Sequence, residues 1–213
     1  MLPLGGARRV GARCVPQAAR RMRDVMESGE SDIHAYVFVA EAGQDTIDRL
    51  KQAEQPDLPP GDTGIRFVAP LSGPYDAVAV VQAADVQALQ DLVLGTIQTG
   101  TMEAGAKLRT ETSIALAFPR IIKRTLARPV EAFVRVWVQP GQGRAVIDNL
   151  EKLGDAYMGA ALVAGDFDIL VELGADTFDE LRETLLTMHE TVEGIARSAS
   201  SITASGVTAE AGG

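Results

Sequence analysis

Two short segments of the chain contain the same combination of residues that can bind a small polar molecule. Residues 72–76 read SGPYD and residues 164–168 read AGDFD, so each has a glycine, an aromatic residue and an aspartate in the same order. An aspartate can pair with an ammonium group, and a glycine lets a ligand approach the main chain because it has no Cβ. The same pattern is also typical of an ordinary turn between strands, in which the aspartate caps the turn.

Hydroxyl side chains recur in a second pair of segments. Residues 109–114 read RTETSI and residues 197–202 read RSASSI. Their hydroxyls could donate to a carboxylate, although serine and threonine are also ordinary at strand ends. Together with the first pair, these segments give the candidate ligand-binding residues, which are Gly73, Tyr75, Asp76, Thr110, Thr112, Gly165, Phe167, Asp168, Ser198 and Ser200.

No other group of residues forms a recognisable catalytic or metal site. His34 and His189 are far apart in the sequence, and a zinc or haem site needs more ligands. Cys14 has no base nearby, and residues 141–143 read GQG, which lacks the third glycine of a dinucleotide-binding loop. We therefore expect no catalytic residue, no metal and no cofactor. Glu172 lies on an expected strand, and its position alone is compatible with either face of the sheet.

The paired segments belong to an internal repeat. AYVFV at 35–39 matches AFVRV at 132–136, and each is followed by a Gly-Gln pair and an Ile-Asp-x-Leu helix segment. The anchors keep their order at a spacing of about 90–100 residues, which is too long for a solenoid repeat. The chain therefore contains a duplicated domain.

Hydrophobic periodicity gives the same order of elements in both copies. We expect strands at 35–40, 65–70, 76–82, 110–117, 131–138, 157–163, 167–173 and 197–204, and helices at 45–54, 85–98, 142–153 and 176–190. Asp85 and Asp176 are expected to cap the helices that follow them.

This order is βαββαβ, the ferredoxin-like plan with an antiparallel sheet. The expected strands are apolar on both faces, so helices can cover one face and a second copy must cover the other. We therefore predict an α+β fold of two tandem ferredoxin-like domains, with their sheets paired as a dimeric α+β barrel type assembly and related by a pseudo-twofold axis.

Composition limits the classes of function. The chain has 213 residues, a formal net charge of −9 and one cysteine. The single cysteine excludes a disulfide scaffold, and the negative net charge argues against direct DNA binding. No apolar run reaches the roughly 20 residues that a membrane span needs, so we expect no membrane partner and a cytoplasmic location. Residues 1–23 contain six arginines and no acid; we expect a disordered leader, or a natural start at Met22 or Met26.

The expected domains follow from these boundaries. They are a basic leader at 1–31, a first domain at 32–117, a basic linker at 118–129, a second domain at 130–204 and a disordered tail at 205–213. The linker contains Arg120, Lys123, Arg124 and Arg128, which could form a solvated segment or a small patch for an anionic partner.

Both copies of the repeat resemble the ligand-binding (RAM) domain of the Lrp/AsnC regulators. The resemblance rests on the Gly-x-aromatic-Asp links, the helices after them and the final strands that begin with Arg-Thr or Arg-Ser. The resemblance implies an amino acid or related metabolite bound between paired domains. It departs from the family in lacking a helix-turn-helix unit, because only about 30 residues precede the first strand. The copies also differ, since Pro74 corresponds to Asp166, so the two sites need not bind alike.

We therefore expect a non-enzymatic, amino-acid-like binding regulator or sensor that acts through ligand-biased assembly. A homo-oligomer is expected, and a separate DNA-binding partner remains possible. Two alternatives stay open. The same fold class hosts monooxygenase-like and haem-binding enzymes, and tandem ACT-type regulatory domains have the same order of elements and a comparable Pro140-Gly141 helix start.

Overall fold

The computed structural model describes residues 32–98, 108–117 and 128–204. The first half of the chain forms the expected elements. Its strands are β1 (Ile33–Ala40), β2 (Gly64–Pro70), β3 (Ala77–Ala83) and β4 (Arg109–Ala117), and its helices are α2 (Gln44–Gln52), α3 (Val86–Asp91) and the π-helical turn η1 (Leu92–Ile97).

The second half repeats this order. Its strands are β5 (Val130–Val138), β6 (Tyr157–Ala164), β7 (Ile169–Ala175) and β8 (Ile195–Ala204), and its helices are α4 (Gly143–Leu150), the 3₁₀ segment η2 (Glu151–Ala156) and α5 (Phe178–Thr191). The strands are ordered β2-β3-β1-β4 in the first half and β6-β7-β5-β8 in the second, so the predicted α+β fold with two similar halves is confirmed.

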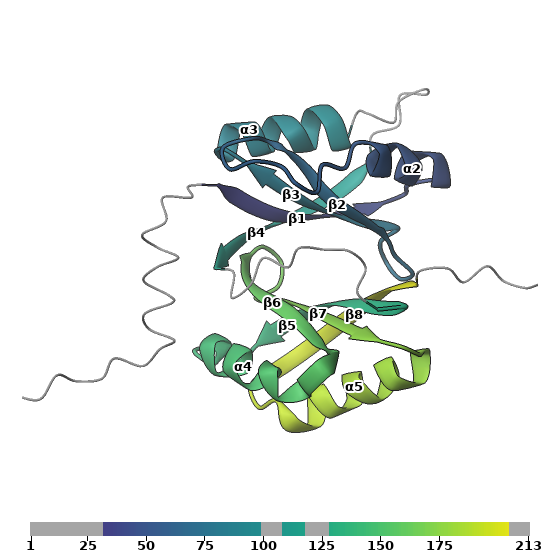
Figure 1. Ribbon diagram of the computed structural model, residues 1–213. Helices are drawn as coiled ribbons and strands as arrows, with labels where there is room; N and C mark the ends of the chain where they lie inside the picture. The colour runs from purple at the N-terminus through teal and green to yellow at the C-terminus, as the bar shows by residue number, and fades with distance from the viewer. Residues whose placement is uncertain (1–31, 99–107, 118–127, 205–213) are drawn as a thin grey trace, which may run out of the picture. The chain divides into compact units, whose positions relative to one another are not determined.

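In each half the helices lie on one face of the sheet (Figure 1). Helices α2 and α3 pack on alternate residues of β1 and β3, such as Val37 and Ala79. Helices α4 and α5 pack in the same way on Val134 and Val171. Side chains alternate between the two faces along each strand. One set therefore packs against the helices, and the other set points to the opposite face of the sheet.

The two half-sheets join into one eight-stranded antiparallel sheet. Strand β4 pairs with β6, where Ile114 lies opposite Ala164. At the other edge, Ser72, just after β2, pairs with Ile202 of β8 through two main-chain hydrogen bonds. The two outer edges of the sheet therefore meet, and the sheet closes into a barrel.

These two junctions are equivalent in the repeat. Ser72 corresponds to Ala164 and Ile114 to Ile202, because the ladders of the two halves have matching registers. Reciprocal contacts of this kind are the mark of a twofold interface. The pairing that the sequence predicts between copies is thus made within a single chain.

The second face of each half-sheet lies inside the barrel. Phe38, Val78, Phe133 and Leu170 are fully or almost fully buried there, in one apolar cluster with residues from both halves. All neighbouring strands are antiparallel, so β1 and β5, which are separated by three strands, run in the same direction. Their ends lie at one end of the barrel, which we call the carboxyl end.

The starts of the two long helices differ from each other. Asp85 caps α3 as predicted, and its side chain accepts a hydrogen bond of 2.8 Å from the Ala88 N–H. Thr177, rather than Asp176, caps α5 by accepting from the Glu180 N–H. The prediction that Asp176 is the cap is therefore wrong.

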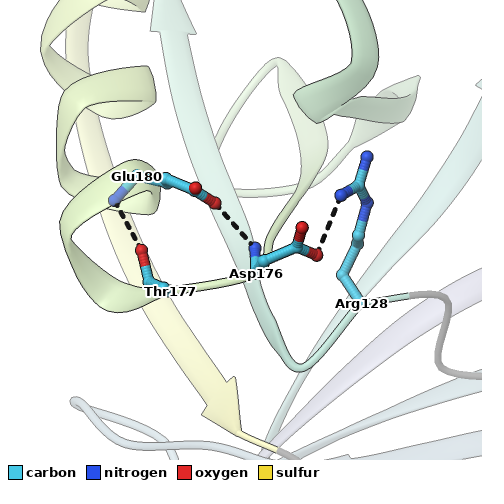
Figure 2. Close-up of polar contacts among 4 residues, drawn as sticks. All are labelled: Arg128, Asp176, Thr177 and Glu180. Atoms are coloured by element: carbon cyan, nitrogen blue, oxygen red, sulfur yellow. Dashed lines mark hydrogen bonds and ion pairs between the residues drawn. The ribbon is translucent and has the colours of Figure 1, made fainter.

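The structure shows what Asp176 does instead (Figure 2). The Glu180 side chain reaches back to the Asp176 N–H in a variant of the capping box. The Asp176 carboxylate pairs with Arg128 at 2.9 Å, and this contact raises the pKa of Arg128. Arg128, which the sequence assigns to the basic linker, thus holds the start of β5 near the start of α5.

Several predictions concern residues outside the described ranges. These are the leader at 1–31, linker residues 118–127 with Arg120, Lys123 and Arg124, and the tail at 205–213. Among the described helices, none has the length and apolar character that crossing a membrane requires.

Candidate binding site in the barrel interior

Both aspartates of the candidate binding loops are bound to the main chain. The Asp76 carboxylate accepts a hydrogen bond of 3.0 Å from the Ala42 N–H, and the Asp168 carboxylate accepts one of 2.8 Å from the Val138 N–H. The N–H groups of Asp76 and Asp168 donate to the carbonyls of Val39 and Val136. Each aspartate therefore fastens the link before β3 or β7 to the end of β1 or β5.

The glycines of these loops are placed where the two halves touch. A Cβ on Gly165 would lie 2.5 Å from the Ser113 Oγ, which is closer than two such atoms can approach. A Cβ on Gly73 would lie 3.4 Å from the Ser201 Oγ, and Gly73 also has a φ of +147°. The close approach that these glycines permit is between the halves of the barrel.

The four predicted hydroxyl residues face the helices. Thr110 accepts a hydrogen bond of 2.6 Å from Gln98 at the end of η1, and Ser198 is hydrogen-bonded to His189 of α5. Thr112 lies opposite Val37, and Ser200 lies opposite Val134, both of which belong to the helix-side cores. The structure therefore does not bring these four residues together with the aromatic residues of the loops.

Tyr75 and Phe167 are the two predicted residues that enter the barrel. Both contact the ring of Phe38, with centroid distances of 5.2 and 6.0 Å. Phe167 is buried and also packs on Trp137 at 6.1 Å. Tyr75 is half-buried, and its hydroxyl belongs to a polar cluster that the sequence analysis did not identify.

The polar cluster crosses the barrel interior. Arg135 of β5 donates a hydrogen bond of 3.2 Å to the Tyr75 hydroxyl, which donates in turn to the Glu111 carboxylate of β4. In a separate contact across the barrel, the Tyr36 hydroxyl donates to Glu172 of β7 at 3.3 Å. The inward direction of Glu172 is thereby settled.

Aromatic rings surround the guanidinium of Arg135. Its central carbon lies 4.7 Å from the centroid of Tyr75, 5.7 Å from that of Phe38 and 5.9 Å from that of Trp137. Arg135 is only 7% exposed. Contact with ring faces offsets part of the cost of burying a cation in this position.

Several polar atoms of this region are buried without a hydrogen-bond partner among the described residues. They are the Arg135 Nε, the Glu111 Oε1, and the hydroxyls of Ser113 and Ser201. An unsatisfied buried polar group costs about 1–3 kcal/mol, and such groups are uncommon in folded proteins. One donor and one acceptor of opposite charge are thus available on either side of the Tyr75 hydroxyl.

The cluster occurs once per barrel although the fold is duplicated. Each residue of the polar cluster and of the Tyr36–Glu172 contact corresponds to an apolar residue in the other half. The equivalent positions are Tyr36 and Phe133, Arg135 and Phe38, Tyr75 and Phe167, Glu172 and Val80, and Glu111 and Ala199. Each half therefore supplies only part of the polar set, and the complete set exists only where both halves are present.

The environment of Tyr75 keeps its hydroxyl protonated. Burial raises the pKa of Tyr75, the adjacent Glu111 carboxylate raises it further, and Arg135 opposes this with a smaller effect. A neutral phenol next to an arginine and a carboxylate can donate and accept a hydrogen bond simultaneously. The Tyr75 hydroxyl therefore links a cationic and an anionic side chain from different halves of the barrel.

A sequence signal for the missed residues does exist. Arg135 and Glu172 interrupt the otherwise apolar segments AFVRVWV and ILVEL, and both fall on the parity opposite to the helix-facing valines. A charge at such a position has no solvent to face once the sheet closes. The signal is readable only when the second face is known to be covered.

No protein-family model and no curated protein matches the sequence. Among solved structures, a double mutant of chlorite dismutase from Candidatus Nitrospira defluvii aligns with a TM-score of 0.55 at 10% identity, over 84% of this chain and 93% of that chain. The complex of the same enzyme with imidazole gives a TM-score of 0.53 at 11% identity, over 86% and 95%. AsnC from E. coli gives 0.35 at 16% identity, over 57% and 70%.

The chlorite dismutase matches extend over most of both chains, and at this identity they concern the fold alone. The TM-score of the AsnC match is too low to support an argument, so the likeness to the Lrp/AsnC ligand-binding domain is a distant one. The chain has the architecture of a dimeric α+β barrel, with both halves supplied by one polypeptide.

Proposed function

We propose that this protein is a non-enzymatic sensor that binds one amino-acid-like molecule inside the barrel. The observation that carries the proposal is the pair of buried, unpartnered atoms Arg135 Nε and Glu111 Oε1 on either side of the Tyr75 hydroxyl. The guanidinium suits the ligand's carboxylate, and the carboxylate of Glu111 suits its ammonium group.

The position of the cluster gives the ligand a means to act on the whole barrel. Glu111 and Tyr75 belong to the first half and Arg135 to the second. A ligand held between Glu111 and Arg135 adds a link between the halves, and so stabilises the closed barrel relative to states in which the halves separate. A partner that distinguishes these states would respond to the ligand, because ligands shift equilibria by their differential affinity.

Isothermal titration calorimetry against the amino acids tests this proposal. We expect at least one to bind with a stoichiometry of one per chain. Glu111→Gln and Arg135→Gln should each weaken that binding by about tenfold or more, because each removes a charge-assisted hydrogen bond.

Arg182→Gln and Glu183→Gln, two exposed positions on α5, are the matched controls and should bind as the wild type does. Circular dichroism of each variant separates a loss of affinity from a loss of fold. If no amino acid binds to the folded wild-type protein, the proposal is wrong.

An enzyme is the second candidate, because the Tyr75 hydroxyl between Arg135 and Glu111 can hydrogen-bond to a bound substrate. The raised pKa of Tyr75 makes the phenol a weak proton donor, so in an enzyme it would position the substrate and not protonate it. Mass spectrometry of the ligand after prolonged incubation with the protein distinguishes the two candidates, since a sensor returns the ligand unchanged.

A further inference from the structure

Arginine side chains gather at the carboxyl end of the barrel, next to the polar cluster. Arg197 of β8 lies opposite Trp137, and Arg109 of β4 lies opposite Ala40. The two arginines are equivalent in the repeat, and both are exposed. Neither side chain has a hydrogen bond or ion pair with any other described residue.

The Arg197 side chain packs on Trp137, whose ring contacts residues of the candidate site. Its guanidinium carbon lies 4.3 Å from the centroid of the Trp137 ring, and the Trp137 indole N–H donates a hydrogen bond of 2.6 Å to the Asp166 carbonyl. Arg109 has no such support, because its neighbour on β1 is Ala40. Arg197 is therefore fixed on a ring of the candidate site, whereas Arg109 lies two residues before Glu111 on the same face of β4 without a ring contact.

Arg135 and Arg197 share this ring. The guanidinium carbon of Arg135 lies 5.9 Å from the centroid of Trp137, and that of Arg197 lies 4.3 Å from it. The distance between the two guanidinium carbons therefore cannot exceed the sum of these two distances. Of the neighbouring carboxylates, Glu111 accepts from Tyr75 through one of its oxygens, and Asp168 accepts from the Val138 N–H. Two cationic groups, one buried and one exposed, thus lie near the same ring.

Resting on the proposed function, we infer that the ligand carries a second acidic group, which Arg197 binds at the carboxyl end of the barrel. The ligand class is then an aminodicarboxylate. Its α-carboxylate lies near Arg135, its ammonium group near Glu111 and its side-chain carboxylate near Arg197. An arginine that lies flat on a ring loses less freedom when it binds an anion than a free one does.

Calorimetry with L-aspartate, L-glutamate, L-asparagine and L-glutamine tests this inference. At least one acid should bind to the wild-type protein about tenfold or more tightly than its amide. Arg197→Gln should remove that preference and leave the affinity for the amide unchanged, and Arg197→Lys should retain part of it.

Arg109→Gln is the matched control, because it removes the same charge from the equivalent position, and it should keep the preference. The inference is overturned if acid and amide bind equally to the wild type, or if Arg109→Gln and Arg197→Gln reduce the preference alike. Binding without a preference for acids refutes the inference and leaves the proposed function standing. A lack of binding by every amino acid refutes both.

Discussion

At the scale of the residue, the central feature is a difference between the two halves. At several equivalent positions, one half has an apolar side chain and the other has a polar one. Arg135 stands where the first half has Phe38, and Tyr75 stands where the second half has Phe167. Each replacement places a polar group in an otherwise apolar interior, at a cost to stability unless it is partnered. The proposed binding function rests on the accumulation of such groups in one region.

Tyr75→Phe tests the role of the phenol in this cluster. It should lower the free energy of unfolding at neutral pH by about 1–3 kcal/mol, because Arg135 and Glu111 both lose a partner. Chemical denaturation measures this quantity. Tyr157→Phe, on the helix side of the sheet, controls for the loss of a hydroxyl outside the barrel.

The same variant should change the alkaline pH dependence of stability. The pKa of Tyr75 is raised in the folded protein, so the unfolded chain releases this proton first. The stability contributed by the group is therefore complete below about pH 10 and is lost as the pH rises through the folded pKa. Tyr75→Phe should show a shallower decline than the wild type above that pH; an identical decline would contradict the assignment.

At the scale of the element, the links between strands have a structural role that their composition did not reveal. Asp76 and Asp168 donate to equivalent carbonyls in the two halves, and each carboxylate accepts from an N–H just beyond that carbonyl. Gly73 and Gly165 allow the loop of one half to pack on a strand of the other. The recurrence of the Gly-x-aromatic-Asp pattern thus follows from the closure of the barrel, and its aromatic residue is the one that enters the interior.

Asp168→Ala distinguishes this structural role from direct ligand binding. The variant should be destabilised by about 1–3 kcal/mol, because the Val138 N–H loses a charged acceptor. The affinity for the ligand should stay within about twofold of the wild type under conditions in which the variant is folded. A large loss of affinity in a folded variant would instead place the Asp168 carboxylate on the ligand.

At the scale of the whole molecule, the two halves depend on each other for the burial of their inner faces. Tyr36, Phe38 and Val78 of the first half are buried together with Phe133 and Leu170 of the second. A half on its own would expose this apolar face to water, at a cost that scales with its area.

A chain that contains only residues 32–117 should therefore form a dimer rather than a monomer, with its sheet covered by a second copy. Size-exclusion chromatography with light scattering measures this directly. Mixing it with residues 128–204 should give a one-to-one complex that recovers the single polar cluster. A stable monomer of residues 32–117 with cooperative unfolding would refute the dependence of the halves on each other.

From the sequence alone one can infer the duplication, the order and approximate ends of the elements, and the need to cover both faces of each sheet. These properties follow from local periodicity, and the structure confirms the fold that they predict. The candidate aromatic residues Tyr75 and Phe167 were also identified because they lie in repeated links.

The side chains that share the barrel interior are known only from the closed sheet. A shift of one residue along a strand moves a side chain to the opposite face, and for this reason Ser113 and Ser201 face inward while Thr112 and Ser200 do not. Arg135 and Glu111 come together from strands in different halves, which no local pattern can specify. The polar cluster is a product of closure, because closure alone brings the inner faces of the two halves into contact.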